Sequence, residues 1–96
     1  MRVAKVVGTI WATRKEERLA GYKLLLVKPI DVINGSEEKS PIVAVDMIGA
    51  GVGETVILVS GGGARNAAGD RNLPVDITVV GIVDDLEIDN KKKAVQ

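Results

Sequence analysis

Hydrophobic and polar residues alternate along much of this chain with the period of two that is typical of β-strands with one buried face. Pro29 lacks a backbone donor, so a strand that reaches it should end there or lie at a sheet edge. Stretches rich in Val, Ile, Leu and Thr are bounded by Gly, Asn, Ser and Pro. They predict five strands: Arg2 to Ala12, Tyr22 to Ile30, Ile42 to Ile48, Thr55 to Ser60, and from Ile77 towards Ile88.

The first and last of these strands show whether their even-numbered or odd-numbered positions should face a core. In the first strand the apolar residues Ala4, Val6, Ile10 and Ala12 occupy even positions, although Val3 and Val7 blur the pattern. In the last strand Asp84 falls among apolar even positions, which indicates a bulge or an interface near it. The residues predicted to be buried are Ala4, Val6, Ile10 and Ala12 in the first strand, and Val80, Ile82, Leu86 and Ile88 in the last.

The segments between the strands complete the predicted fold. Residues 34–39 are typical of an exposed loop, and a short turn of helix is expected from Ala64 to Ala68. Five short strands with one small helical insert favour a mainly β fold, a small, partly open five-stranded β-barrel of the OB type. The 96 residues fit one domain, which we place at 1–90, followed by a short basic tail at 91–96.

Three of the predicted strands have apolar residues at both even-numbered and odd-numbered positions, for example Leu24-Leu25-Leu26-Val27 and Val56-Ile57-Leu58-Val59. A small barrel has only one inner face, so apolar residues on the outer face need a second cover. In a chain this short, another copy of the same chain is the simplest cover. The alternative is a few exposed Val and Ile side chains, which are normal on protein surfaces.

The composition argues against several classes of binding partner and ligand. The chain has 13 basic and 13 acidic residues, so no net charge attracts nucleic acid or an anionic membrane. No apolar run approaches the roughly 20 residues of a membrane-spanning helix. We therefore expect a cytoplasmic protein with no nucleic-acid and no membrane partner. His and Cys are absent, which removes the usual zinc ligands, and we expect neither a metal nor a cofactor.

Two glycine clusters invite a phosphate-binding interpretation. Residues 49–54 lack the spacing of a dinucleotide fingerprint and lead into a strand rather than a helix. A tight connection in which backbone packs on backbone explains these glycines better. The cluster at residues 61–63 precedes the expected helix, where either a flexible turn or a site for a small anion is possible.

Few features of the sequence favour a catalytic role. Without His there is no ordinary general base near neutral pH, and the spacing of the carboxylates identifies no catalytic pair. We expect that the protein is not an enzyme. The alternative to a structural role is an OB-type binding module for an oligosaccharide, single-stranded nucleic acid or small anion, although Trp11 and Tyr22 are the only aromatic residues for stacking. Trp11 fits a subunit contact as well as a partly exposed barrel position.

Motifs along nearly the whole chain resemble those of the EutN/CcmL family. They start with Val3-x-x-Val6-x-Gly8-x-Ile10-x-Ala12-Thr13 and Leu19-x-Gly21-x-Lys23-Leu24. The central motif is Val43-Ala44-Val45-Asp46-x-x-Gly49-Ala50-Gly51-x-Gly53-Glu54-x-Val56. Gly61-x-x-Ala64-Arg65, Pro74-Val75-Asp76 and Gly81-Ile82-Val83-Asp84 follow in order. The resemblance implies a small β-barrel that forms a homopentamer and caps the vertices of a bacterial microcompartment shell.

The resemblance also implies roles for particular residues. Those implied at the pentamer axis or interface are Gly49, Ala50, Gly51, Gly53, Glu54 and Arg65. The glycines and Ala50 would pack around the axis, and Glu54 and Arg65 would make polar contacts between subunits or at the rim. A basic cluster would face neighbouring hexameric shell proteins, or would be an ordinary solvated loop; its residues are Arg14, Lys15 and Arg18.

Overall fold

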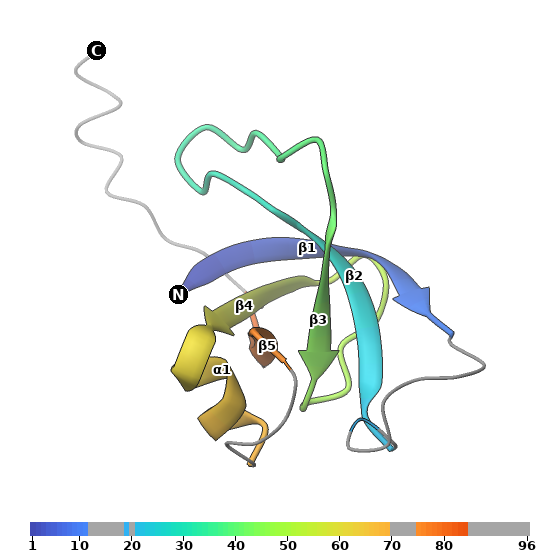
Figure 1. Ribbon diagram of the computed structural model, residues 1–96. Helices are drawn as coiled ribbons and strands as arrows, with labels where there is room; N and C mark the ends of the chain where they lie inside the picture. Colours follow the sequence, from blue (N-terminus) through green and yellow to red (C-terminus); the bar gives the residue numbers. More distant parts are fainter. Residues whose placement is uncertain (12–18, 20, 70–74, 85–96) are drawn as a thin grey trace.

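The computed structural model describes residues 1–11, 19, 21–69 and 75–84. Five strands and one helix follow one another along these residues (Figure 1). Each expected strand is present, and their bounds are β1 Arg2–Ile10, β2 Lys23–Pro29, β3 Ile42–Asp46, β4 Thr55–Ser60 and β5 Ile77–Ile82. Helix α1, Gly61–Ala67, lies between β4 and β5.

The strands form a closed barrel in the order β1-β2-β3-β5-β4. All neighbouring strands are antiparallel except β3 and β5, which are parallel and pair only at Val45↔Thr78 and Asp46↔Val79. This short parallel pair completes the ring of strands, so the partly open barrel expected from the sequence is in fact closed. The mainly β, five-stranded architecture with one short helix is confirmed.

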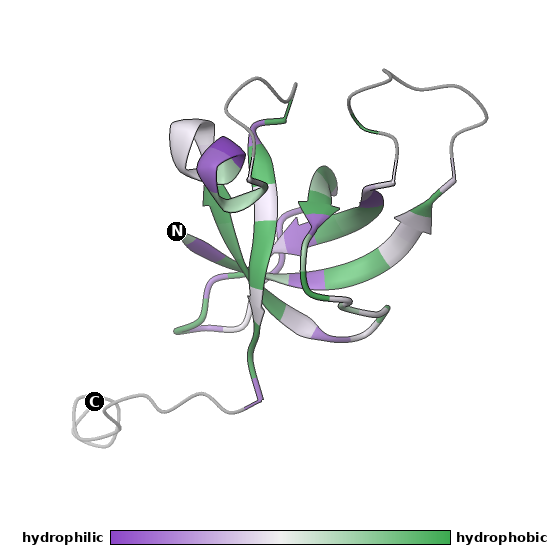
Figure 2. Ribbon diagram, turned by 90° about the horizontal axis from the view of Figure 1, so that it is seen from below, coloured by the Kyte–Doolittle hydropathy of each residue, from purple (hydrophilic) through white to green (hydrophobic). Residues whose placement is uncertain are grey.

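The core inside the barrel is made of small aliphatic side chains. Leu25 is its largest fully buried member, and among the described residues it contains no aromatic ring. Figure 2 shows the mainly apolar strands that surround it. The buried residues of this core are Ala4, Val6, Leu25, Val27, Ala44, Ala50, Val56, Leu58 and Val79. Ala4 and Val6 were predicted to be buried, and both are fully buried.

A bulge in β1 explains why its alternation is blurred. Val6 pairs with Val27 and Gly8 pairs with Leu26, so Val7 is an extra residue without a partner. Cross-strand partners share a face of the sheet, and beyond the bulge Ile10 shares its face with the half-buried Leu24. The prediction that Ile10 is buried is therefore wrong, because the bulge reverses the parity. Ala12 lies outside the described residues.

A second bulge lies in β5. Leu58 pairs with Val79 and Ile57 with Gly81, which leaves Val80 as the extra residue. Val79 is fully buried and Val80 is half-buried, so the predicted burial of Val80 is wrong. Ile82, beyond the bulge, packs against the core but is half-buried rather than buried as predicted. The irregularity is thus at Val80 rather than beside Asp84, and Leu86 and Ile88 lie outside the described residues.

Helix α1 begins at Gly61, three residues before the predicted start at Ala64. It packs on the outside of β4 and β5, where the Thr78 hydroxyl donates a hydrogen bond of 2.8 Å to the Ala64 carbonyl. The Tyr22 hydroxyl donates to the Ala68 carbonyl at 3.1 Å. These contacts enclose a second apolar cluster on the outer wall, formed by Val45, Ala68, Val75, Leu19, Tyr22 and Leu24.

The second cluster changes the expectation drawn from the doubly apolar strands. Val45 points outward from the barrel, since its neighbour Ala44 belongs to the core, yet it is only 2% exposed. The chain therefore covers part of its own outer wall. The remaining apolar outer surface lies elsewhere on the barrel and is described below.

Candidate functional site

The turn between β3 and β4 lies at one end of the barrel, where β1, β3 and β5 end and β2 and β4 begin. We call this end the turn end. Oδ1 of Asp46 accepts hydrogen bonds from the backbone N–H groups of Ile48, at 3.0 Å, and Gly49, at 3.2 Å. An Asp side chain that binds the backbone two residues on starts a turn. This turn is why β3 ends at Asp46 and not at the predicted Ile48.

Glu54 closes the turn from its other side. Its Oε1 accepts a hydrogen bond of 2.6 Å from the Gly51 N–H, and its own N–H donates to the Gly51 carbonyl. Gly49 and Gly53 have φ angles of +82° and +92°, in the left-handed region that favours glycine. Gly53 also donates a backbone hydrogen bond to Val6 of β1. The glycines therefore build a defined turn rather than a flexible loop.

One side chain of the turn is buried, and several others are exposed. Ala50 is fully buried and belongs to the barrel core. Met47, Ile48 and Val52 are 42%, 41% and 64% exposed, which is unusual for three aliphatic side chains on one short turn. Trp11, which follows β1 at this same end, is 90% exposed. The turn end thus carries apolar groups that nothing in the described part of the chain covers.

A second uncovered apolar surface lies on the outer wall of the barrel, across β1, β4 and β5. Val3 of β1 pairs with Ile57 of β4, and Ile57 pairs in turn with Gly81 of β5. Ile30, just after β2, donates a backbone hydrogen bond to Val3 on its other side. We call the row Ile30, Val3, Ile57 and Gly81 the outer ladder. Each of its members is half-exposed.

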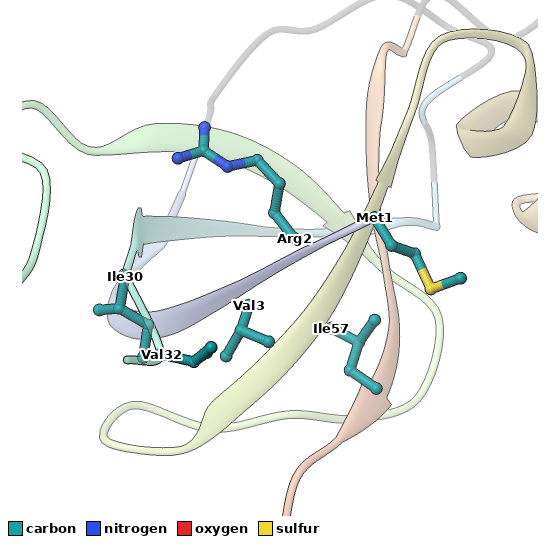
Figure 3. A pocket seen from close by; sticks show the side chains of 6 residues that line it. All are labelled: Met1, Arg2, Val3, Ile30, Val32 and Ile57. Carbon is teal, nitrogen blue, oxygen red and sulfur yellow. The ribbon is translucent and has the colours of Figure 1, made fainter. Parts of the chain in front are cut away.

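Three members of the outer ladder, Ile30, Val3 and Ile57, line a hollow of about 440 Å³ together with Met1, Arg2 and Val32 (Figure 3). Figure 3 shows the Arg2 side chain pointing away from the aliphatic side chains of Val3, Ile57 and Val32. Arg2 instead forms an ion pair with Glu38 from the loop between β2 and β3. The hollow is therefore lined mainly by aliphatic groups.

The residues implied by the family resemblance occupy different parts of the structure. Gly49, Gly51, Gly53 and Glu54 lie together in the turn. Arg65 lies on α1, beyond the other end of β4, where it donates to the Val75 carbonyl at 3.5 Å. Glu54 and Arg65 are therefore not neighbours within one chain. The residues Arg14, Lys15 and Arg18 lie outside the described residues.

The outer ladder and the hollow beside it were not expected from the sequence. A signal was present, since Val3 disturbed the alternation of the first strand and Ile57 lay in a strand that is apolar at both parities. The register of β1 on β4, which no local pattern reveals, brings these two residues together.

The aromatic residues do not form a platform for nucleic acid. Single-strand binding barrels stack successive bases on neighbouring exposed rings. Trp11 is exposed, but Tyr22 packs in the second apolar cluster with its hydroxyl bound to Ala68. This arrangement does not favour the alternative of a single-stranded nucleic-acid binding module. In the part of the chain that is described, no helix has the length and apolar character needed to cross a membrane.

Comparison with known proteins agrees with this architecture. The family model described as "Ethanolamine utilisation protein EutN/carboxysome" matches residues 1–84. The chain belongs to the EutN/CcmL family. The microcompartment shell vertex protein EutN of Salmonella typhimurium is 46% identical over 86 residues, which is 90% of this chain and 86% of that protein. The carboxysome shell vertex protein CcmL of Synechococcus elongatus is 41% identical and covers 95% of this chain and 91% of its own.

Solved EutN/CcmL structures share the fold. An ethanolamine utilization protein EutN superposes with a TM-score of 0.86 at 45% identity, over 92% of this chain and 91% of its own. The pentameric microcompartment shell protein GrpN from Rhodospirillum rubrum superposes with a TM-score of 0.81 at 41% identity, over 92% of this chain and 99% of its own. The family inferred from the sequence motifs is confirmed, and its EutN/CcmL members are named as shell vertex proteins rather than enzymes.

Proposed function

We propose that this chain forms a homopentameric ring that caps the vertices of a bacterial microcompartment shell, in contact with hexameric shell proteins. Relatives that are 41–46% identical are shell vertex proteins, and one solved relative is described as pentameric. A flat layer of hexagonal tiles cannot close, and five-fold tiles supply the missing curvature. The observation that carries the proposal is the uncovered apolar surface of the barrel, because a neighbouring subunit would shield it.

A closed ring of identical subunits uses two different patches on each subunit. The structure offers two candidates, the outer ladder and the apolar side chains of the turn end. Both sets consist of uncharged side chains. The charged Lys23 and Glu54 lie beside the turn, and Arg2 lies beside the hollow but turns away from it and binds Glu38. Interface cores are depleted in charge in the same way.

The site residues take their places in this proposal as follows. Gly49, Gly51 and Gly53 would let the turns of the five subunits approach closely at the ring axis, and Ala50, fully buried beneath them, would hold the turn on the barrel core there. Glu54 and Arg65, at opposite ends of β4, would make polar contacts with different neighbours or at the rim. Arg14, Lys15 and Arg18 would face the hexameric shell proteins.

The oligomer mass tests the ring directly. In native mass spectrometry or light scattering at micromolar concentration, the protein should have about five times the 10.1 kDa mass of one chain. A ring held by apolar surfaces should survive moderate salt, because the hydrophobic effect does not depend on charge. A stable monomer at these concentrations would contradict the proposal.

Replacement of Gly51 tests the position of the axis. A Cβ at Gly51 would lie 3.4 Å from Oε1 of Glu54, and its φ angle is not in the left-handed region, so the chain tolerates a side chain there locally. Gly51→Leu should therefore reduce the pentamer in gel filtration more than it reduces β-structure in circular dichroism. Gly63→Leu on α1 is the control, since its Cβ would meet nothing within 4 Å. Equal losses of assembly and structure in Gly51→Leu would place Gly51 away from the axis.

The basic cluster is tested by charge reversal. Glu in place of Arg14, Lys15 and Arg18 should leave the pentamer intact and reduce its recovery with a co-expressed hexameric shell protein. A variant with Lys91, Lys92 and Lys93 changed to Glu serves as the control for net charge. Equal recovery of the two variants would assign the Arg14 cluster to an ordinary solvated loop.

A further inference from the structure

Three groups from different parts of the chain meet at the turn end of the barrel. Lys23, the first residue of β2, is the register partner of Asp46, the last residue of β3. The Lys23 ammonium donates a hydrogen bond of 2.9 Å to the carbonyl of Ala50, in the middle of the turn. The same ammonium lies 4.0 Å from Oδ2 of Asp46.

The Asp46 carboxylate is buried, and only one of its two oxygens has hydrogen-bond partners among the described residues. Its side chain is 1% exposed, and Oδ1 accepts two backbone hydrogen bonds from the turn. Oδ2 is buried and has no hydrogen-bond partner among the described residues. A buried carboxylate is costly unless a charge compensates it. Lys23 is the cation that lies against it here.

The Lys23 side chain itself is 46% exposed, so packing of the core does not require it. The other side chains that hold the turn belong to its flanks, Asp46 before it and Glu54 after it. Lys23 is different because it comes from a neighbouring strand of the barrel wall. It therefore ties the middle of the turn to a rigid element.

We propose that Lys23 is a positioning residue for assembly: it fixes the Ala50 carbonyl against the barrel wall, with Asp46 as its counter-charge, so that the turn meets the neighbouring subunit in one preformed shape. This inference rests on the proposed function. Ordering a flexible loop on association costs free energy, and a preformed loop avoids that cost. The exposed side chains that this would hold in place are Met47, Ile48 and Val52.

The test must separate positioning from charge compensation. Lys23→Met alone leaves the buried Asp46 without a counter-charge. A lower free energy of unfolding in this variant would therefore not distinguish a role of Lys23 in positioning the turn from its role in compensating the charge. The double variant Lys23→Met with Asp46→Asn removes both charges, while the amide oxygen of the substituted side chain can still accept the two backbone hydrogen bonds of the turn. We expect this double variant to melt close to the wild type in circular dichroism and to require about tenfold higher concentration to form the ring.

Two further variants complete the design. Lys23→Arg keeps the charge and the donors, and it should restore most of the assembly. Lys39→Met removes an exposed lysine of the loop between β2 and β3 and should behave as the wild type. Amide hydrogen exchange of the monomer, measured by mass spectrometry, should show faster exchange at residues 49–53 in the double variant only.

The outcomes are distinct. A double variant that forms the ring at wild-type concentration, or whose residues 49–53 exchange as slowly as the wild type, overturns the role of Lys23. Unfolding of the double variant also overturns it, because the pair would then hold the barrel rather than the turn. If the wild type is monomeric, the proposed function fails, and the exchange measurement alone decides whether Lys23 orders the turn.

Discussion

The outer wall of the barrel has two apolar regions that differ in what covers them. Around Val45, Ala68 and Val75, helix α1 and the residues before β2 form a second small core, and Val45 is 2% exposed. Around the outer ladder, Val3 and Ile57 are equally aliphatic but half-exposed, and no described segment lies over them. The two regions lie on the same sheet and have the same chemistry.

The difference shows how one short chain uses separate apolar regions for its own folding and for assembly with other copies. A domain of this size buries a limited share of its surface, so its own stability is modest. The covered region adds to the stability of the single chain, since each buried Val or Leu contributes about 1.5–3 kcal/mol. The uncovered region adds nothing until another molecule lies on it. Substitutions in the two regions should therefore separate folding from assembly.

The largest effect is expected in the covered region. Val45→Asp would bury a charge without a partner and should lower the free energy of unfolding by about 4 kcal/mol or more. Val43→Asp is the matched control, because Val43 lies two residues earlier on the same face but is 48% exposed. Thermal unfolding by circular dichroism measures both. A Val45→Asp protein as stable as the Val43→Asp protein would show that the second cluster does not stabilise the chain.

The next effect is on assembly. Ile57→Asp should lower the free energy of unfolding of the monomer by only about 1 kcal/mol, because Ile57 is half-exposed. It should weaken the ring by at least about 2 kcal/mol per contact, as the loss of a central interface residue does. The readout is the pentamer fraction against concentration in native mass spectrometry. Thr55→Asp, on the same face of β4, is the control, and an Ile57→Asp ring as stable as this control would remove the outer ladder from the interface.

A smaller effect is expected where the helix is fastened to the barrel. Thr78→Val removes the hydroxyl that donates to the Ala64 carbonyl, which still accepts a hydrogen bond from the Ala68 N–H. The cost should be about 1 kcal/mol in urea denaturation, with no effect on the ring. Thr55→Val, a half-buried position on β4, is the comparison. An unchanged urea midpoint in Thr78→Val would mean that this hydrogen bond adds nothing to helix docking.

The smallest effect concerns the ion pair beside the hollow. Arg2 and Glu38 are both about half-exposed, at 55% and 51% of their side-chain surface. Glu38→Gln should change the free energy of unfolding by less than about 1 kcal/mol, and the difference should shrink in high salt. Chemical denaturation at low and high sodium chloride measures this. A larger, salt-independent loss would show that the pair holds the loop between β2 and β3 in place.

The sequence predicted the fold well because local signals agree with the global arrangement. The strands, the single helix and the buried Ala4 and Val6 follow from period-two patterns and turn residues. The errors at Ile10 and Val80 share one cause, a bulge that reverses parity within a strand. Asp46 is a further case, since its side chain ends β3 two residues earlier than the apolar pattern suggests.

The candidate site was predictable only in part. The glycine-rich turn is visible in the sequence because its residues are contiguous, and positive φ angles at Gly49 and Gly53 explain its composition. The outer ladder is not visible, because it joins Val3 of β1, Ile57 of β4 and Ile30, just after β2. Likewise, the contact between Lys23 and Ala50 spans 27 positions. Such pairs depend on strand register, which a single sequence does not disclose.

The closure of the barrel by the brief β3–β5 pairing has a consequence for how copies meet. An open sheet has a free edge whose unpaired N–H and C=O groups invite any extended chain to add a strand. In this barrel every strand has a neighbour on both sides. Along the lengths where a strand is paired on both sides, contacts between molecules must therefore be made by side chains rather than by continued backbone ladders. Recognition of this kind is selective for one partner surface and protects a densely packed, repetitive shell from runaway fibre growth.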